Sequence, residues 1–258
     1  MNATQDKPIA FLGVAFSDRD TERALEWTMA AAASDRFAYV VTPNVDHLVM
    51  FHSSAEDGWQ RAYRDAIKAS DLCLNDSRIL QRLSRISGER LPIAPGSDLT
   101  RHLISARREQ PGSVALVGGA AREAAWLAAA LPHHRILHCS PPMGVRDKPE
   151  LQREIARFVE QSSADVVFIA IGAPQSEIVA HAISRRGSAR GVALCIGASI
   201  EFLSGAKRRA PTWMQRAGLE WLFRLASEPA RLWRRYLVEG PRIFLIWRRA
   251  RVRRGACR

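Results

Sequence analysis

Short runs of Val, Ile, Leu and Ala alternate with longer amphipathic segments along most of the chain. Apolar runs of this length are typical of strands that are buried on both faces. The predicted strands are 9–16, 38–42, 71–74, 114–118, 135–139, 166–171 and 192–196. Apolar residues recur at helical spacing in 20–34, 44–53, 56–69, 77–86, 98–108, 120–131, 149–161 and 176–186. The alternation predicts an α/β fold over residues 1–206, in which a parallel, Rossmann-like sheet carries helices on both faces.

The residues that follow each predicted strand are the first candidates for chemistry, because ligands of such sheets lie beyond the carboxyl ends of the strands. Several of these segments, such as GGAARE at 118–123 and GAPQSE at 172–177, place glycine just before a helix. Backbone N–H groups and the helix dipole can bind phosphate there. The first strand is not followed by GxGxxG, however, and no GxxxxGK[ST] occurs. The pattern therefore favours a nucleotide-type ligand other than NAD or ATP bound in the usual way.

Positive charge is concentrated after residue 206. Residues 207–258 contain 15 Lys and Arg against 3 Asp and Glu, so the whole net charge of +12 lies in this tail. Helical projection of 212–226 and 230–237 separates arginine from Trp, Leu and Met, which predicts a basic, amphipathic helical appendage. An anionic membrane surface, a diphosphate or a nucleic acid would each suit such a tail. If the protein bound nucleic acid, the glycine-containing segments after the strands would have no evident role. If it were a nucleotide-dependent oxidoreductase, it would be expected to carry the GxGxxG fingerprint, which is absent.

Several segments resemble the WecG/TagA/CpsF family of bacterial glycosyltransferases, glycosyltransferase family 26. They are TPNVDHLV (42–49), the Asp after DLCLN, GSDL (96–99), SPPMG (140–144), GAPQSE (172–177) and RRAPTWMQRAGLEWLFRLASEPARLWRRYL (208–237). The resemblance implies inverting transfer of a sugar from a UDP-sugar to a polyprenyl-diphosphate-linked saccharide, without a metal ion or other cofactor. It also implies peripheral association with the inner face of the cytoplasmic membrane and no nucleic-acid partner. Relatives use N-acetylmannosamine, its uronic acid or glucose, and neither the donor sugar nor homo-oligomerisation follows from the sequence.

The resemblance also assigns candidate site residues. An inverting transfer needs one general base for the acceptor hydroxyl, and Asp76 is the candidate, with capping of the next helix as the alternative. Thr42 and Asn44 match a T-x-N element, although a Thr-Pro-Asn turn that caps a helix is an equal alternative. The remaining substrate-binding candidates are Gly144, Gly172, Pro174, Gln175, Glu177, Glu201, Arg209, Arg216, Arg224, Arg231 and Arg235.

The sequence departs from the family pattern at several of these positions. Ser77 stands where glycine is usual, and Gln175 stands where lysine is usual, which removes a positive charge. Glu201 replaces a usual Asp. Glu177 matches, but an acidic residue in a first helical turn also complements the helix dipole. The usual Arg before GSDL is absent, with Ile93 at that position and Arg90 nearby.

Asp18 and Asp20 form a D-x-D, the pattern that holds a metal ion in many other transferases. Their position at the start of a helix favours a capping role instead. Cys73, Cys139 and Cys195 lie within apolar runs, which is typical of reduced, buried thiols in a cytosolic protein. The run 9–16 lacks the basic flank of a signal peptide, and no apolar run has the ~20 residues that a membrane span needs.

Overall fold

A six-stranded parallel sheet forms the centre of the protein. The computed structural model describes residues 7–53 and 58–256. The strand order is β4 (Leu72–Cys73), β3 (Ala38–Val41), β8 (Val192–Cys195), β7 (Val166–Ala170), β5 (Gly112–Gly118) and β6 (His134–Cys139). Every neighbouring pair in this sheet is parallel. The predicted α/β class is confirmed, and the strands agree with the predicted ranges to within about two residues.

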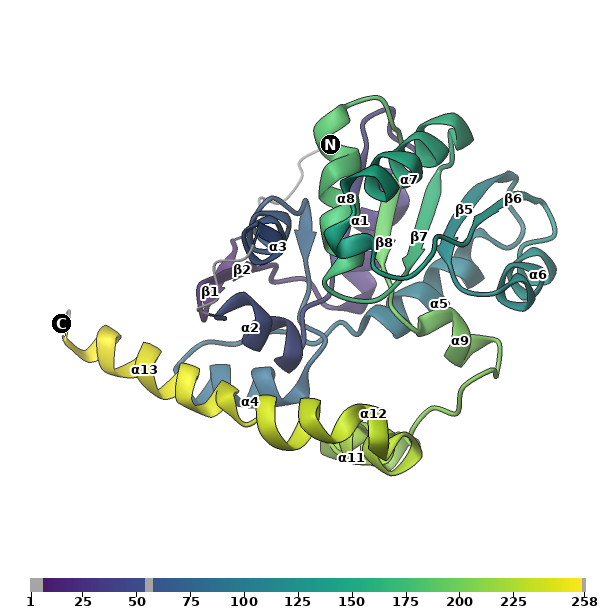
Figure 1. The fold of residues 1–258 in the computed structure, drawn as a ribbon. Helices are drawn as coiled ribbons and strands as arrows, with labels where there is room; N and C mark the ends of the chain where they lie inside the picture. The colour runs from purple at the N-terminus through teal and green to yellow at the C-terminus, as the bar shows by residue number, and fades with distance from the viewer. Residues whose placement is uncertain (1–6, 54–57, 257–258) are drawn as a thin grey trace.

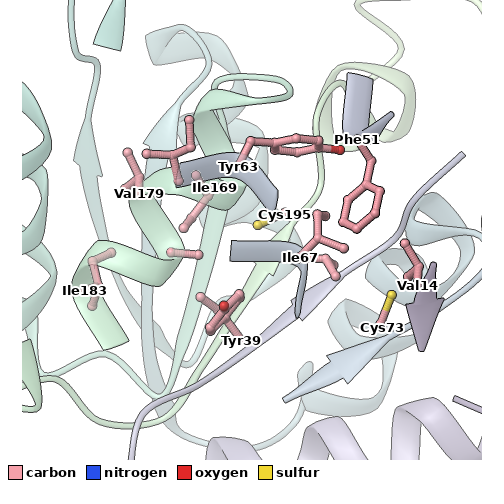
Figure 2. Close-up of a cluster of buried hydrophobic side chains, with 14 of the residues drawn as sticks. Val14, Tyr39, Phe51, Tyr63, Ile67, Cys73, Ile169, Val179, Ile183 and Cys195 are labelled. Carbon is pink, nitrogen blue, oxygen red and sulfur yellow. The ribbon is translucent and has the colours of Figure 1, made fainter. Parts of the chain in front are cut away.

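Helices cover both faces of this sheet (Figure 1). They are α1 (Thr21–Ala32), α2 (Val45–Phe51), α3 (Gly58–Lys68), α4 (Arg78–Ile86), α5 (Gly96–Arg107), α6 (Ala121–Ala130), α7 (Pro149–Ser162), α8 (Gln175–Arg186) and α9 (Ser199–Leu203). Side chains of α3, α7 and α8 pack in one buried cluster, part of which Figure 2 shows, and those of α1, α5 and α6 pack in a second. Alternate strand residues, such as Tyr39 and Val40, point into opposite clusters. The first two residues of the predicted helix 56–69 lie outside the described residues.

The segment 9–16 is not a strand of the sheet, and this prediction was wrong. It forms an antiparallel hairpin of β1 (Ile9–Phe11) and β2 (Val14–Phe16). Leu12 and Gly13 both have positive φ, 48° and 74°, and so reverse the chain between the two strands. Phe11 and Phe16 are buried in the first cluster. The apolar run at 9–16 correctly indicated a buried segment, but it gave no indication of the turn at Leu12 and Gly13.

The basic tail folds into successive helices, α10 (Thr212–Ala217), α11 (Glu220–Ser227), α12 (Pro229–Trp233) and α13 (Arg242–Ala256), with a π-helical turn η2 (Arg234–Glu239) before the last. The predicted continuous helix over 212–226 is interrupted at Gly218, whose φ is 75°. A glycine in the left-handed conformation ends a helix, and here the Leu219 N–H donates to the Met214 carbonyl at 2.8 Å.

The tail lies along α2 and α4 (Figure 1). Arg82 of α4 donates a hydrogen bond to the Ala217 carbonyl (3.1 Å), and the Trp247 indole donates one to Ser87 Oγ (2.8 Å). Ile243 is buried in the same cluster as the hairpin. Trp213 does not pack on the domain, because 63% of it is exposed. Trp221 is half-buried and contacts Tyr236.

Candidate active site

Asp76 lies directly after β4, at the carboxyl edge of the sheet. Its N–H donates to the Pro43 carbonyl (3.1 Å), which joins the loops that follow β4 and β3. Ser77, not Asp76, caps α4, because its Oγ accepts the Leu80 N–H (3.3 Å). Capping therefore does not explain the aspartate. Ser77 has a φ of −147°, an extended backbone that any residue adopts, so serine is unstrained where the family usually has glycine.

The Asp76 carboxylate accepts no hydrogen bond from any residue within the described ranges 7–53 and 58–256. Burial, helped by the nearby Glu220 carboxylate, raises the pKa of Asp76 to about 7. The positive charges of Arg224, His47 and Arg209 act in the opposite direction. A carboxylate with a pKa near neutrality is suited to accept a proton at physiological pH. We call Asp76, His47, Arg209, Glu220 and Arg224 the Asp76 site.

Two tail arginines reach this site. Arg209, between α9 and α10, donates from Nη1 to Asp98 Oδ1 of α5 at 2.9 Å. Arg224 of α11 donates from Nη2 to Glu220 Oε1 at 2.8 Å, and its guanidinium lies 5.0 Å from the Phe202 ring centroid. The Nε atoms of both arginines are buried and lack a partner among the described residues. Each guanidinium therefore has one N–H group that no described residue satisfies.

The start of α11 is placed beside Asp76 by the α10–α11 joint. A Cβ at Gly218 would lie 3.6 Å from Arg78 Cβ, and Arg78 is the first residue of α4. Glu220 follows Gly218 by two residues, and Asp76 precedes Arg78 by two. The contact explains how residues far apart in the sequence form one site.

The segment after β3 contributes Thr42, Asn44 and His47. Thr42 packs against Gly96, where a Cβ would lie only 2.7 Å from Thr42 Oγ1, so that only glycine fits. Asn44 caps α2, and its Oδ1 accepts the N–H groups of Asp46 (3.0 Å) and His47 (3.4 Å). The capping alternative for Asn44 is thus confirmed. The ring of His47 lies between Asn44 and Glu177, 2.9 Å and 3.3 Å away.

The loops after β6 and β7 are tied together by Gln175. Its amide accepts a hydrogen bond from the Arg146 N–H (3.3 Å) and donates one to the Ile171 carbonyl (3.2 Å). Gly144 and Gly172 both have positive φ, 86° and 77°, at the turns after these strands. Pro174 directly precedes α8, and Glu177 is in its first turn, almost wholly buried.

The other candidates are paired with neighbouring charged side chains or are exposed. Glu201 pairs with Lys207 Nζ (2.9 Å), and Arg231 pairs with Glu228. Arg235 pairs with Asp46 of α2, and Arg216 is exposed. Sequence reasoning missed His47 and Glu220 as site residues. The spacing of His47, three residues after the Asn44 cap and so over the first helical turn, could have indicated it.

Asp20 caps α1 and accepts the Arg23 N–H at 3.0 Å, so the capping interpretation of the D-x-D is confirmed for this residue. Asp18 pairs with Arg23. Within residues 7–53 and 58–256, no three His, Cys, Asp or Glu side chains gather as they would around a metal ion. Cys73 and Cys195 are buried free thiols, as predicted, and Cys139 is half-buried.

The fold and the site together define an α/β protein that carries an unpaired carboxylate, a histidine and two arginines at the carboxyl edge of a parallel sheet. A family model described as the glycosyl transferase WecG/TagA/CpsF family matches residues 9–256. The chain belongs to this family and is a glycosyltransferase. The resemblance seen in the sequence is confirmed.

Curated relatives include two enzymes named N-acetylglucosaminyldiphosphoundecaprenol N-acetyl-beta-D-mannosaminyltransferase. The one from Bacillus subtilis strain 168 is 30% identical over 183 residues, 69% of this chain and 68% of that protein. The one from Bacillus spizizenii strain W23 is 42% identical over 86 residues, so the match spans only 33% of either protein.

Two solved structures of a domain of unknown function, DUF1792, are similar over 73% of this chain and 81% of theirs. Both are 12% identical to it, and their TM-scores are 0.46 and 0.48. The second of these domains is described as having a distinct glycosyltransferase fold.

Proposed function

We propose that the protein is an inverting glycosyltransferase that moves a sugar from a UDP-sugar to a polyprenyl-diphosphate-linked saccharide, with Asp76 as the general base. The observation that carries the proposal is the Asp76 carboxylate, which is free of hydrogen bonds from described residues, has a pKa near 7 and is flanked by Arg209 and Arg224. The names of the relatives favour N-acetylmannosamine as the sugar and N-acetylglucosaminyl-diphosphoundecaprenol as the acceptor.

The reaction is a single displacement. The acceptor hydroxyl oxygen attacks the anomeric carbon as its proton passes to Asp76, and the bond from that carbon to the β-phosphate oxygen breaks. The bonding electron pair leaves with UDP, whose added negative charge must be stabilised. Arg209 and Arg224 are suited to this role, since the charges of both guanidinium groups act at the Asp76 carboxylate. These charges would act in place of a metal ion.

The tail would also contact an anionic membrane surface. Its large exposed apolar side chains are Trp213, Leu222, Trp233, Leu237, Val238, Phe244, Leu245 and Val252. Exposed arginines, including Arg234, Arg242 and Arg248, lie among them in the sequence. Apolar side chains that enter the interface beside basic residues are typical of helices that lie on a membrane. Such docking would keep the protein at the inner face of the cytoplasmic membrane, where a lipid-linked acceptor is found.

No described helix is both long and apolar enough to cross a bilayer.

The test is a transfer assay with the purified protein, a panel of UDP-sugars and a short-chain prenyl-diphosphate N-acetylglucosamine. We expect a disaccharide product with one donor of the panel, and a loss of activity in Asp76→Asn while UDP still binds. Near-normal turnover of the purified variant would exclude Asp76 as the base.

A further inference from the structure

An ion pair joins the basic tail to the helix that follows β3. Arg235 of η2 donates from Nε to Asp46 Oδ2 on α2, and the two residues are 189 positions apart in the sequence. Only 12% of the Asp46 side chain and 38% of the Arg235 side chain are exposed. The Asp46 N–H donates to Asn44 Oδ1 at 3.0 Å, so the turn after β3 fixes the backbone that carries the carboxylate. Asp46 is therefore a firm point of attachment for the tail.

The part of the tail that precedes α13 buries few side chains. Every residue of α10, α11, α12 and η2 is described, and Leu232 is the single buried residue among them. By contrast, α13 is anchored by the buried Ile243 and by the hydrogen bond from Trp247 to Ser87. A segment that buries little apolar area can open locally at a low cost in free energy. Polar contacts therefore contribute strongly to the position of α11 and η2.

The ion pair of Arg235 can act on α11 through η2. Tyr236 of η2 packs on Trp221 of α11, with the two ring centroids 6.2 Å apart. At the start of α11, Arg82 of α4 donates a hydrogen bond to the Ala217 carbonyl at 3.1 Å. Helix α11 is thus connected to the sheet domain at α4 and, through η2, at α2.

We propose that the Asp46–Arg235 ion pair is a latch that holds η2 and α11 on the sheet domain, so that Arg224 of α11 is in place when the nucleotide sugar binds. Arg235 is then a positioning residue that acts through α11, and not the substrate contact that the resemblance implied. The effect of the latch on sugar transfer rests on the proposed function, whereas its effect on the tail does not.

A latch and a substrate contact have different kinetic signatures. Without the ion pair, a fraction of the molecules has a displaced tail, and binding of the donor must also restore the tail. The KM for the donor then rises, while kcat at saturation changes little. Removal of an arginine that contacts the diphosphate in the transition state would instead lower kcat.

The kinetic test uses Asp46→Asn and Arg235→Gln, each of which removes the charge on one side of the pair. With a water-soluble acceptor, each should raise the KM for UDP-N-acetylmannosamine about tenfold, the scale of one charged hydrogen bond. The double variant should be no worse than either single variant, and Asp46→Glu, which keeps the charge, should retain a near-normal KM. If Asp46→Asn leaves KM unchanged, or if the two effects multiply in the double variant, the latch is excluded.

The Glu160–Arg186 ion pair offers a matched control within the sheet domain. It joins α7 to α8 with an Nε–Oε1 distance of 2.5 Å, and its side chains are 14% and 39% exposed, close to the values for the latch. Glu160→Gln should leave the KM for the donor unchanged. An equal rise in KM in this variant would show that the loss of any half-buried ion pair has the same effect, and would overturn the proposal.

Hydrogen–deuterium exchange of the whole protein tests the latch without an activity assay. In Asp46→Asn and Arg235→Gln, the amides of α11 and η2 should exchange about tenfold faster, while those of β5 and β7 keep their rates. Unchanged exchange in α11 and η2 would overturn the latch. If Asp46→Asn does not fold, Arg235→Gln, at the more exposed side chain, decides the question. Faster exchange in a protein that transfers no sugar would contradict the proposed function and leave the latch intact.

Discussion

Replacement of Asp76 by asparagine should remove activity and, at neutral and alkaline pH, make the fold more stable. Burial raises the pKa of Asp76 from 3.8 to about 7 in the folded protein. Between these two values the folded state holds a proton that the unfolded state has released. The contribution of Asp76 is therefore favourable below about pH 4 and is lost as the pH rises through 7.

The magnitude follows from the same shift. A difference of about three units corresponds to roughly 4 kcal/mol, which is an upper limit for the cost of ionising Asp76 in the folded protein. Asparagine carries no charge and avoids this cost. At about pH 8, Asp76→Asn should therefore be more stable than the unmodified protein, and this difference in stability should be larger than at about pH 4. Its turnover should fall by roughly two to four orders of magnitude.

Urea unfolding of both proteins at these two pH values measures the gain. Asp35→Asn, at an exposed aspartate, is the control and should change stability little at either pH. If Asp76→Asn is equally stable or less stable than the unmodified protein at about pH 8, the carboxylate is not destabilised in the fold, and the argument for a raised pKa is wrong.

Three further predictions concern the rest of the site and the tail. Glu220→Gln should move the acidic limb of the kcat/KM profile to lower pH, because Glu220 raises the pKa of Asp76. Arg224→Gln should move this limb to higher pH, because Arg224 lowers the same pKa. Shifts of the two variants in the same direction would contradict these electrostatic effects. EDTA should leave the rate unchanged, and a rate restored only by Mg²⁺ or Mn²⁺ would require a metal site. Changing the exposed Trp233 and Phe244 to serine should weaken sedimentation with anionic liposomes while activity on a water-soluble acceptor persists; unchanged sedimentation would leave these side chains without a membrane role.

The periodicity of the sequence was sufficient to predict the sheet and its covering helices. A run such as 166–171 is apolar because both of its faces are buried, and this constraint is local. The hairpin at 9–16 was not predicted, because its turn depends on the positive φ of Leu12 as well as Gly13. The break at Gly218 was missed because the apolar spacing continues across it, although glycine there could have indicated a helix end.

The site was only partly predictable, since it is assembled by long-range contacts. The position of Asp76 after a strand could be anticipated from the topology of parallel sheets. The arrival of Glu220 and Arg224 beside it depends on the packing of the tail on α4. The pairing of His47 with Glu177 likewise joins residues from two different strand ends. The spacing of residues along the sequence does not indicate long-range contacts of this kind.

The most direct test of the account is the anomeric configuration of the product. The unmodified protein would be incubated in EDTA with α-linked UDP-N-acetylmannosamine and a short-chain prenyl-diphosphate N-acetylglucosamine, and the new glycosidic bond would be assigned by NMR. A single displacement with one base predicts a β linkage, formed by the unmodified protein and not by Asp76→Asn. An α linkage, or a β linkage formed as fast by the variant, would contradict the central claim that Asp76 takes the acceptor proton in an inverting transfer.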